Sequence, residues 1–413
     1  MAEPVQNLLP SLSSRREYFD YLDRWTVGTV DHLRAHMTGR ALVKAYLLET
    51  SRADGDRDPL GALAALGQRV TRVDETLHTV QAAGESEDWA LVEVEDERYP
   101  VLYTALESKV ADDRIDNLVF QSAAFDRAWF AAPMFNRLWD VVLQAFPDHR
   151  YTQFVFEYES AFETSPDALA GSNEGDDSEV VGSDDQEDHQ LRPERRRARM
   201  QISERLGKLR DSLLKMRENY EPLESVVRLR VPAPIRGGHD VYFDGKFTNR
   251  ADSVTSLRQT VELVTAIYRH STEGAEAAAW PQSSDILDRG RPLSLGAPLL
   301  IKFNAPLEQA TFDRWMAVLR RKNNRFRLWG NPIEMGPGKV HLYAVDHHLW
   351  QTIDLEITRE HLYALLPSGT CGNTIHRLVA NIQRFVDPKL SSYIGDRPYA
   401  SFLQDAPLTV SRG

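Results

Sequence analysis

The stretch 340-VHLYAVDHHLWQTIDLEI-357 decides how the C-terminal part of the chain folds. Its apolar and β-branched residues predict a strand from Val340 to Val345 and a second from Leu349 to Ile357. Around it we expect one α+β unit, made of strands at Leu299–Phe303 and Phe326–Trp329 and helices at Leu307–Arg321, Thr358–Leu366 and Gly372–Val386. This β-α-β-β-α order is compatible with a ferredoxin-like sandwich and equally with other α+β folds.

The residues before this unit predict two regions that differ in secondary structure. Residues 14–83 look helical, because Tyr18, Tyr21, Leu22 and Trp25 recur at helical spacing, as do Leu42, Val43, Tyr46 and Leu47. Residues 84–163 mix strands and helices, and Tyr151–Glu159 alternates like a strand with one buried face.

An acidic segment separates the two halves of the predicted molecule. Residues 164–191 carry nine Asp and Glu among Gly and Ser, with almost no large apolar residue, so we expect a disordered linker. A basic amphipathic helix should follow over 192–225, with a seam formed by Ile202, Leu206, Leu209, Leu213, Met216 and Tyr220. That seam packs on its own domain or, alternatively, pairs with a partner chain through a 202–220 self-association helix.

We therefore predict an α+β protein made of five regions. These are a helical N-terminal region (1–83), a first α+β region (84–163), the linker (164–191), the basic helix (192–225) and a C-terminal α+β domain (226–413).

The composition excludes several functional classes. The net charge is −12, so a strongly basic nucleic-acid binder is not expected, although a local basic patch remains open. The single cysteine, Cys371, excludes an intrachain disulfide and a cysteine-based zinc knuckle, and fits a reducing compartment. We see no signal peptide and no membrane span, and expect a soluble cytoplasmic protein with no membrane partner.

A Gly- and hydroxyl-rich turn opens the last long predicted helix. Free backbone N–H groups and the helix dipole favour an anion there. A phosphate or carboxylate pocket would use Ser368, Thr370, Gly372, Asn373, Thr374, His376 and Arg377. The alternative is a well-capped helix after a tight turn, with Asn373 or Thr374 as the cap.

Two clusters of basic residues are candidates for contact with nucleic acid or a partner. The first is Arg320, Arg321, Lys322, Arg325 and Arg327, with Trp315 and Trp329 nearby for base stacking. The second is Arg195, Arg196, Arg197 and Arg199, which directly follows the acidic linker; the linker would then mimic nucleic acid and block the patch. The alternative for the first cluster is an ordinary basic helix end with both Trp residues in the core.

We predict no catalytic residue, no metal and no cofactor. Our leading hypothesis is a non-catalytic intracellular binding or assembly subunit of a multi-protein complex, in a bacterial defence or nucleic-acid-processing system, with protein partners and an optional nucleic-acid partner. The rival hypothesis is a hydrolase or nuclease in the His-rich C-terminal unit, using Cys371 or the histidines at 341, 347, 348, 361 and 376. Convergence of His347, His348, His376 and Cys371 in one pocket would favour the enzyme.

Overall fold

The computed structural model describes residues 8–34, 41–50, 57–159, 197–217, 221–280, 282–288, 291–321, 324–367 and 369–404. Its helices are α1 (Arg15–Arg34), α2 (Pro59–Ala65), α3 (Ser108–Gln121), α4 (Ala132–Ala145), α5 (Leu206–Arg217), η2 (Glu221–Glu224), α6 (Val254–Ala279), α7 (Gln309–Leu319), α8 (Asn373–Phe385) and α9 (Ser401–Gln404). The mixture of helices and antiparallel sheets confirms the α+β class.

The larger sheet has eleven strands in the described part of the chain, in the order β2-β3-β4-β5-β1-β11-β10-β9-β7-β8, with β6 beside β1. Its strands are β1 (Lys44–Thr50), β2 (Arg69–Arg72), β3 (Leu77–Gln81), β4 (Ala90–Glu93), β5 (Val101–Thr104), β6 (Phe125–Arg127), β7 (Tyr151–Glu159), β8 (Arg197–Arg205), β9 (Val226–Pro232), β10 (Gly238–Tyr242) and β11 (Lys246–Asn249). Neighbouring strands run antiparallel, as in β1 against β5 and β11.

Both faces of this sheet are covered. Every residue of β1 is buried, and its side chains alternate between two cores. Tyr46 and Leu48 join the smaller core beneath α2 and α3, whereas Ala45 and Leu47 join the larger core on the opposite face. An apolar strand buried on both faces has no polar alternation, which is why its sequence resembles a buried helix.

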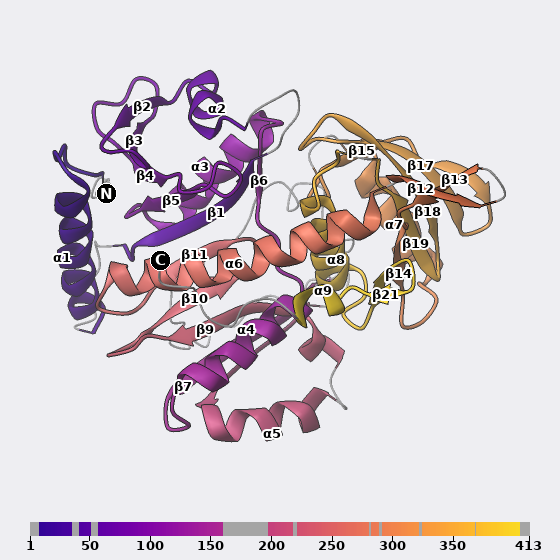
Figure 1. Ribbon diagram of the computed structural model, residues 1–413. Coiled ribbons are helices and arrows are strands. Elements are labelled where there is room, and N and C mark those ends of the chain that lie inside the picture. Colours follow the sequence, from indigo (N-terminus) through magenta and orange to yellow (C-terminus); the bar gives the residue numbers. More distant parts are fainter. Residues whose placement is uncertain are drawn as a thin grey trace, which may run out of the picture.

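The second sheet has eight strands in the described residues and forms one end of the molecule (Figure 1). Its order is β15-β17-β18-β19-β14-β20-β21, with β16 also paired to β17. The strands are β14 (Leu299–Lys302), β15 (Leu328–Gly330), β16 (Ile333–Gly336), β17 (Lys339–Asp346), β18 (Gln351–Thr358), β19 (His361–Leu365), β20 (Ser391–Ile394) and β21 (Arg397–Pro398); a separate hairpin pairs β12 (Gln282–Asp288) with β13 (Arg291–Leu295). Helices α7 and α8 link β14 to β15 and β19 to β20, an order compatible with a ferredoxin-like sandwich.

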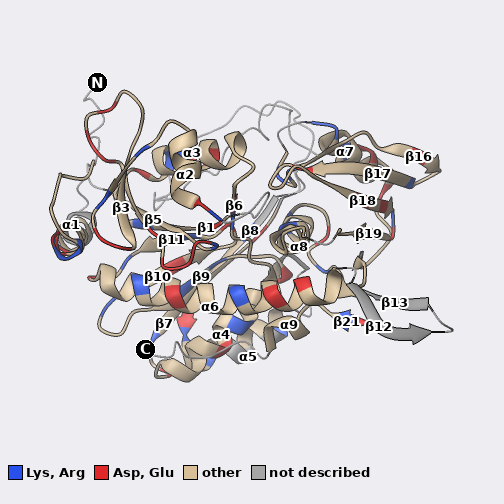
Figure 2. Cartoon of the chain, turned by 45° about the horizontal axis from the view of Figure 1, so that its top comes forward, with Lys and Arg blue, Asp and Glu red and all other residues tan. Residues whose placement is uncertain are grey.

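Helix α6 connects the two sheets. Its 26 residues span about 39 Å at 1.5 Å per residue, and its N-cap is Ser253, whose hydroxyl oxygen accepts a hydrogen bond from the Ser256 N–H. It contacts β1 and β11 in the first sheet and α8 and β20 in the second. Figure 1 shows it crossing the molecule from α1 to α8, and Figure 2 shows charged residues of both signs along it.

Three predicted helices are wrong. The segment around Tyr46 and Leu47 is β1, the segment from Val70 to Val80 contributes β2 and β3, and Thr358–Leu366 contains β19. Within the predicted helix over 192–225, Arg197–Arg205 form strand β8, and helix α5 begins at Leu206. In β1 and β19 a short apolar run fits both periods, and pairing with neighbouring strands decides the outcome.

Strands from both sides of the predicted linker belong to one sheet. Strands β9 to β11 follow the acidic segment in the sequence, yet they complete the sheet that β1 and β7 begin. The linker predicted at 164–191 lies outside the described residues.

Candidate functional site

A cluster of buried charged groups lies where the two sheets meet along α6. Glu49, near the end of β1, accepts hydrogen bonds from Arg98 Nε at 2.9 Å and Nη2 at 2.7 Å. Arg98 also pairs with Glu276 of α6, with Nη1 3.1 Å from Oε2. The Tyr268 hydroxyl donates to the second oxygen of Glu49 at 2.8 Å. The cluster therefore ties β1, the loop before β5 and α6 together.

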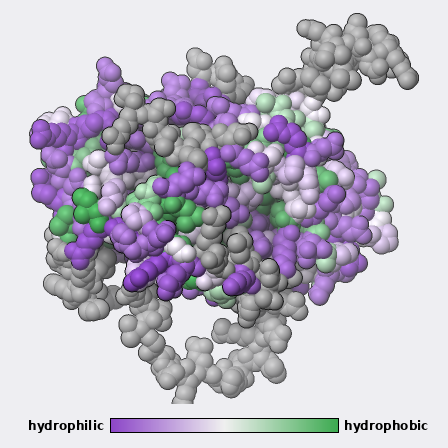
Figure 3. Space-filling view, turned by 60° about the horizontal axis from the view of Figure 1, so that its bottom comes forward, coloured by the Kyte–Doolittle hydropathy of each residue, from purple (hydrophilic) through white to green (hydrophobic). Residues whose placement is uncertain are grey.

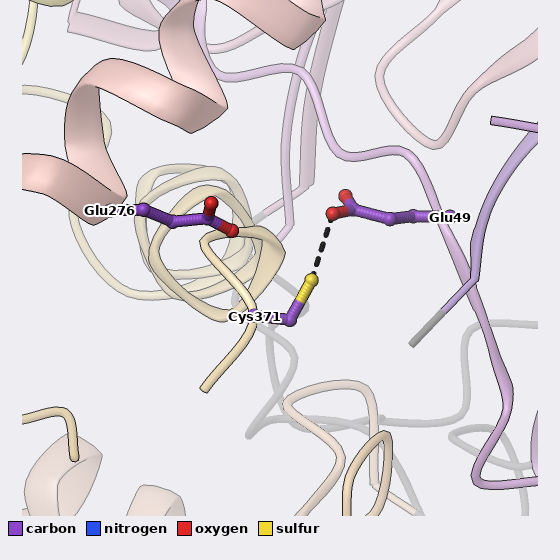
Figure 4. A group of neighbouring side chains, drawn as sticks. All are labelled: Glu49, Glu276 and Cys371. Atoms are coloured by element: carbon purple, nitrogen blue, oxygen red, sulfur yellow. Dashed lines mark hydrogen bonds between the residues drawn. The ribbon is translucent and has the colours of Figure 1, made fainter. Parts of the chain in front are cut away.

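The same cluster receives the start of α8. The Cys371 thiol donates to Glu49 Oε1 at 2.8 Å (Figure 4). The Gly372 N–H donates to Glu276 Oε1 at 2.8 Å. Gly372 is needed here, because a Cβ atom would lie 2.8 Å from Glu276 Cγ and 2.9 Å from Thr272 Cγ2.

Glu49, Glu276 and Cys371 have the donor set of a cation site. Their ligand atoms lie within 4.8 Å of one another, and all three residues are buried. However, Arg98 Nη2 already contacts both carboxylates and lies 3.7 Å from the Cys371 sulfur. The guanidinium thus takes the place of the cation, and its positive charge opposes a metal ion in the same space.

The Cys371 thiol is poorly suited to act as a nucleophile. Burial, and then the Glu49 carboxylate, raise its pKa well above the ordinary value. Thiol reactivity needs the thiolate, so this cysteine stays protonated at neutral pH. Burial alone would raise the pKa of Glu49, but the Arg98 guanidinium keeps it below its usual value, so the buried pair is ionised.

A second buried cluster joins α8 to β6 and to the end of β17. Arg377 pairs with Asp126 and with Asp346, the latter at 2.6 Å. Arg327 lies 3.1 Å from Asp126 and donates to the main-chain oxygens of Phe125 and Val119 at 2.7 and 2.8 Å. The second sheet therefore meets the first through ion pairs and backbone hydrogen bonds rather than through an apolar interface alone.

The predicted anion pocket at the start of α8 is used internally. The anion at this helix start is the carboxylate of Glu276, as described above. The other predicted ligands bind the chain itself: Thr370 to Pro367, Asn373 to Arg127, Thr374 to Asp346, His376 to Thr272 and Tyr399, and Arg377 to Asp126 and Asp346. Ser368 lies outside the described residues.

The predicted basic patches are only partly at the surface. Arg320 is exposed and Arg321 is half-buried, whereas Arg327 is buried and ion-paired, which corrects its assignment to the patch. Arg325 lies over the Phe385 ring at 4.8 Å. Arg199 is exposed on strand β8, opposite Glu157. Arg195, Arg196 and Lys322 lie outside the described residues, as does the side chain of Arg197.

The C-terminal histidines do not all share one pocket: His348 and His376 both lie close enough to Glu49 to interact with its carboxylate, whereas His341 and His347 lie elsewhere. Burial lowers the pKa of His376 to about 4, and that imidazole lies against Tyr268 near Glu49. His348 is fully buried near the second cluster, and neither of its ring nitrogens has a hydrogen-bond partner among the described residues. His347 stacks on the exposed Trp350, with ring centroids 5.4 Å apart. His341 pairs with Asp354 on the exposed side of the second sheet.

That exposed side is where exposed apolar side chains are most concentrated in the described residues. Along β17 and β18 buried residues alternate with residues that are at least partly exposed, so one face of the second sheet is buried and the other is open. Seven of the twelve exposed large hydrophobic side chains in the described residues lie within 329–365. The outer sheet face, as we call it, consists of Trp329, Ile333, His341, Tyr343, Val345, Asp354, Glu356, Tyr363 and Leu365.

Strand register makes the outer sheet face continuous. Ile333, His341, Glu356 and Tyr363 lie opposite one another in a row across β16 to β19. Tyr343, Asp354 and Leu365 form the next row. By contrast, on the face shown in Figure 3 hydrophilic residues predominate, and hydrophobic ones form small separate groups.

The sequence did not reveal the main parts of either site. Glu49, Arg98 and Glu276 belong to segments that meet only in the folded chain. The one local signal is a Glu that ends a long apolar run, since buried carboxylates need partners. The exposed aromatic residues could have been found by the alternation in β17, where Val340, Leu342 and Ala344 are buried and the residues between them are not.

Fold and site together define an α+β protein of two antiparallel sheets, joined by buried ion pairs and carrying one open aromatic face. The chain belongs to the MJECL33-like protein family, whose model matches residues 9–398. It is also similar to a Methanocaldococcus jannaschii protein described as "Uncharacterized protein MJECL33". The two are 29% identical over 149 residues, 36% of this chain and 34% of that protein, so the alignment spans about a third of the relative. No solved structure matches the chain.

No helix in the described residues is long and apolar enough to cross a membrane.

Proposed function

We propose that this protein is a non-catalytic binding or assembly subunit that holds a protein partner on the outer sheet face. The observation that carries the proposal is the concentration of exposed aromatic and apolar side chains on this one face, including Trp329, Tyr343 and Leu365. Contiguous exposed apolar patches mark interaction sites, and Tyr and Trp are enriched in interfaces.

The charges on the face favour a protein over a nucleic acid. The carboxylates of Asp354 and Glu356 lie in the middle of the face, paired with His341 and with Lys339 respectively, the latter at 2.9 Å. A phosphate backbone crossing these rows would meet two acidic groups, whereas nucleic-acid grooves need an excess of positive charge. Aromatic and apolar contacts between paired charges suit a protein surface.

The buried clusters support the non-catalytic half of the proposal. Cys371 and His376 are buried, hydrogen-bonded within the chain and held in their neutral forms, while Arg98 fills the space between the acidic groups. A general acid or base must lie within hydrogen-bonding distance of a substrate, whereas these groups are buried and hydrogen-bond to other groups of the chain. Place within the cell, and membership of a defence or nucleic-acid-processing system, remain predictions.

The test is an affinity capture with the full chain and two surface variants. Tyr343→Ser with Tyr363→Ser removes the two tyrosine rings from the outer sheet face, and Ile235→Ser removes an exposed apolar side chain elsewhere. We expect partner proteins retained by the wild type and by Ile235→Ser to be lost from the double variant. The proposal fails if the double variant retains the same partners, or if nuclease treatment releases everything captured; the second result would indicate nucleic acid.

A further inference from the structure

A groove lies behind the edge of the second sheet, on the side of α7. It has a volume of about 570 Å³. One face of α7 forms one wall, with Gln309, Phe312, Met316 and Arg320, and strand β16 with the turn around it forms the other, with Pro332 and Glu334. The floor is largely apolar, since Phe312 and Met316 are buried core residues.

The strand that borders this groove is an edge strand. Strand β16 pairs with β17 on one side, and the described chain provides no strand for its other side. All four of its residues are exposed. The backbone N–H and C=O groups along such an edge are a template for an added strand.

Four charged side chains line the groove, and the described residues leave two of them without an ion-pair partner. The carboxylate of Asp313 accepts from Gln309 at 2.8 Å, and Lys339 pairs with Glu356. Arg320 and Glu334, in contrast, have no ion-pair partner in the described part of the chain. An edge strand beside a helix-walled groove is the arrangement in which β-strand addition gives affinity through the backbone and specificity through alternate side chains.

We infer that the groove between α7 and β16 binds an extended peptide segment of a partner protein, which adds a strand to the β16 edge. The segment places an apolar side chain against Phe312 and Met316, and sets an acidic group against Arg320 and a basic one near Glu334. The inference deepens the proposed binding function and rests on it. The groove lies on the α7 side of β16 and adjoins the outer sheet face, to which Ile333 of the same strand belongs.

The probe is a display library of random nine-residue peptides, selected on the immobilised full chain. Enriched peptides are synthesised, and their binding is measured by fluorescence anisotropy. We expect them to share an apolar residue flanked by charged residues of opposite sign. Arg320→Glu should weaken their binding about tenfold, because a charge-assisted contact becomes repulsive. Arg321→Glu is the matched control, since it makes the same charge change one residue away and outside the groove, and should change binding less than about twofold.

Hydrogen exchange separates strand addition from other modes of binding. Peptide binding should slow amide exchange within residues 333–336, because an added strand hydrogen-bonds to that edge. The inference is overturned if no peptide is enriched, if exchange at 333–336 is unchanged, or if Arg320→Glu and Arg321→Glu have equal effects. Peptides that lose binding with Tyr343→Ser and Tyr363→Ser but not with Arg320→Glu would overturn it while supporting the proposed function.

Discussion

Arg98 is the residue on which the buried junction depends most. Its guanidinium neutralises Glu49 and Glu276, which come from different elements and are both buried. Removing one partner of a buried ion pair leaves an uncompensated charge, which costs several kcal/mol. We therefore expect Arg98→Met to lower the free energy of unfolding by about 3–5 kcal/mol in urea denaturation.

The matched control for this prediction is Arg269→Met. Arg269 also pairs with a carboxylate, Asp96, at 2.6 Å, but both side chains are partly exposed. Surface pairs contribute about 0–1 kcal/mol, so this variant should change stability little. Equal losses of unfolding free energy for the two variants would mean that burial of the Arg98 ion pairs does not increase their contribution to stability.

The neutral state of Cys371 gives a second prediction. Burial and the neighbouring Glu49 carboxylate raise the pKa of its thiol, so the native protein should react with a thiol reagent such as DTNB only as fast as it opens. Absorbance of the released thiolate at pH 8 measures the rate. The unfolded chain in urea is the control and should react at once. Rapid reaction of the native protein would contradict the assignment and revive the nucleophile hypothesis.

His376 predicts how stability depends on pH. Burial lowers the pKa of its imidazole from the ordinary value of 6.5 to about 4, so the unfolded chain binds this proton more readily than the folded one. Stability from this residue is therefore present above pH 6.5 and is lost as the pH falls toward 4, by about 3 kcal/mol at pH 4. His376→Gln should make the stability profile between pH 7 and pH 4 shallower by this amount. An unchanged slope would show that His376 is not buried in its neutral form.

At the scale of elements, the approach of α8 to α6 depends on Gly372. Its backbone is in the right-handed helical region, so alanine meets no backbone strain there. The added Cβ would lie 2.8 Å from Glu276 Cγ and 2.9 Å from Thr272 Cγ2. We expect Gly372→Ala to lower the free energy of unfolding by roughly 1–3 kcal/mol through overpacking, measured by urea denaturation. A variant as stable as the wild type would mean that the two helices can separate freely.

The elements show what the sequence could and could not predict. Strand β17 and helices α7 and α8 were predicted close to their observed bounds. Strand β17 and helix α7 each have one clear period and one buried face, and the apolar residues of α8 recur at helical spacing although nearly all of its residues are buried. Strand β1 was predicted as helix because its side chains fill two cores and carry no polar alternation. The sequence did not identify β19 as a strand, because a run of five residues fits both the helical and the strand period.

The candidate site was less predictable than the elements. The sequence indicated that the start of α8 favours an anion, and the structure places Glu276 there. No local sequence pattern connects Glu276 with Gly372, or Arg98 with Glu49 and Glu276. These residues are far apart in the sequence, and the local composition does not indicate which of them come together in the folded chain. The prediction of Arg327 as a surface residue failed for the same reason, since its partner Asp126 lies some two hundred residues away.

At the scale of the whole molecule, the polar groups fall into two sets with different roles. The buried set joins the two sheets along α6 and α8, and each charge in it meets a partner from another part of the chain. The exposed set, on the outer sheet face, has its charges paired and its aromatic rings free of cover. We therefore assign the buried ion pairs to stability and the outer sheet face to partner binding.

The most direct test measures the affinity of a partner, once captured, for interior and surface variants of the full chain. Cys371→Ala changes the interior cluster, and Tyr343→Ser with Tyr363→Ser changes the outer sheet face. We predict that Cys371→Ala binds within about twofold of the wild type, whereas the double tyrosine variant loses at least tenfold, roughly 1.4 kcal/mol or more. The opposite result, binding lost with Cys371→Ala and kept by the tyrosine variant, would contradict the account and place function in the buried cluster.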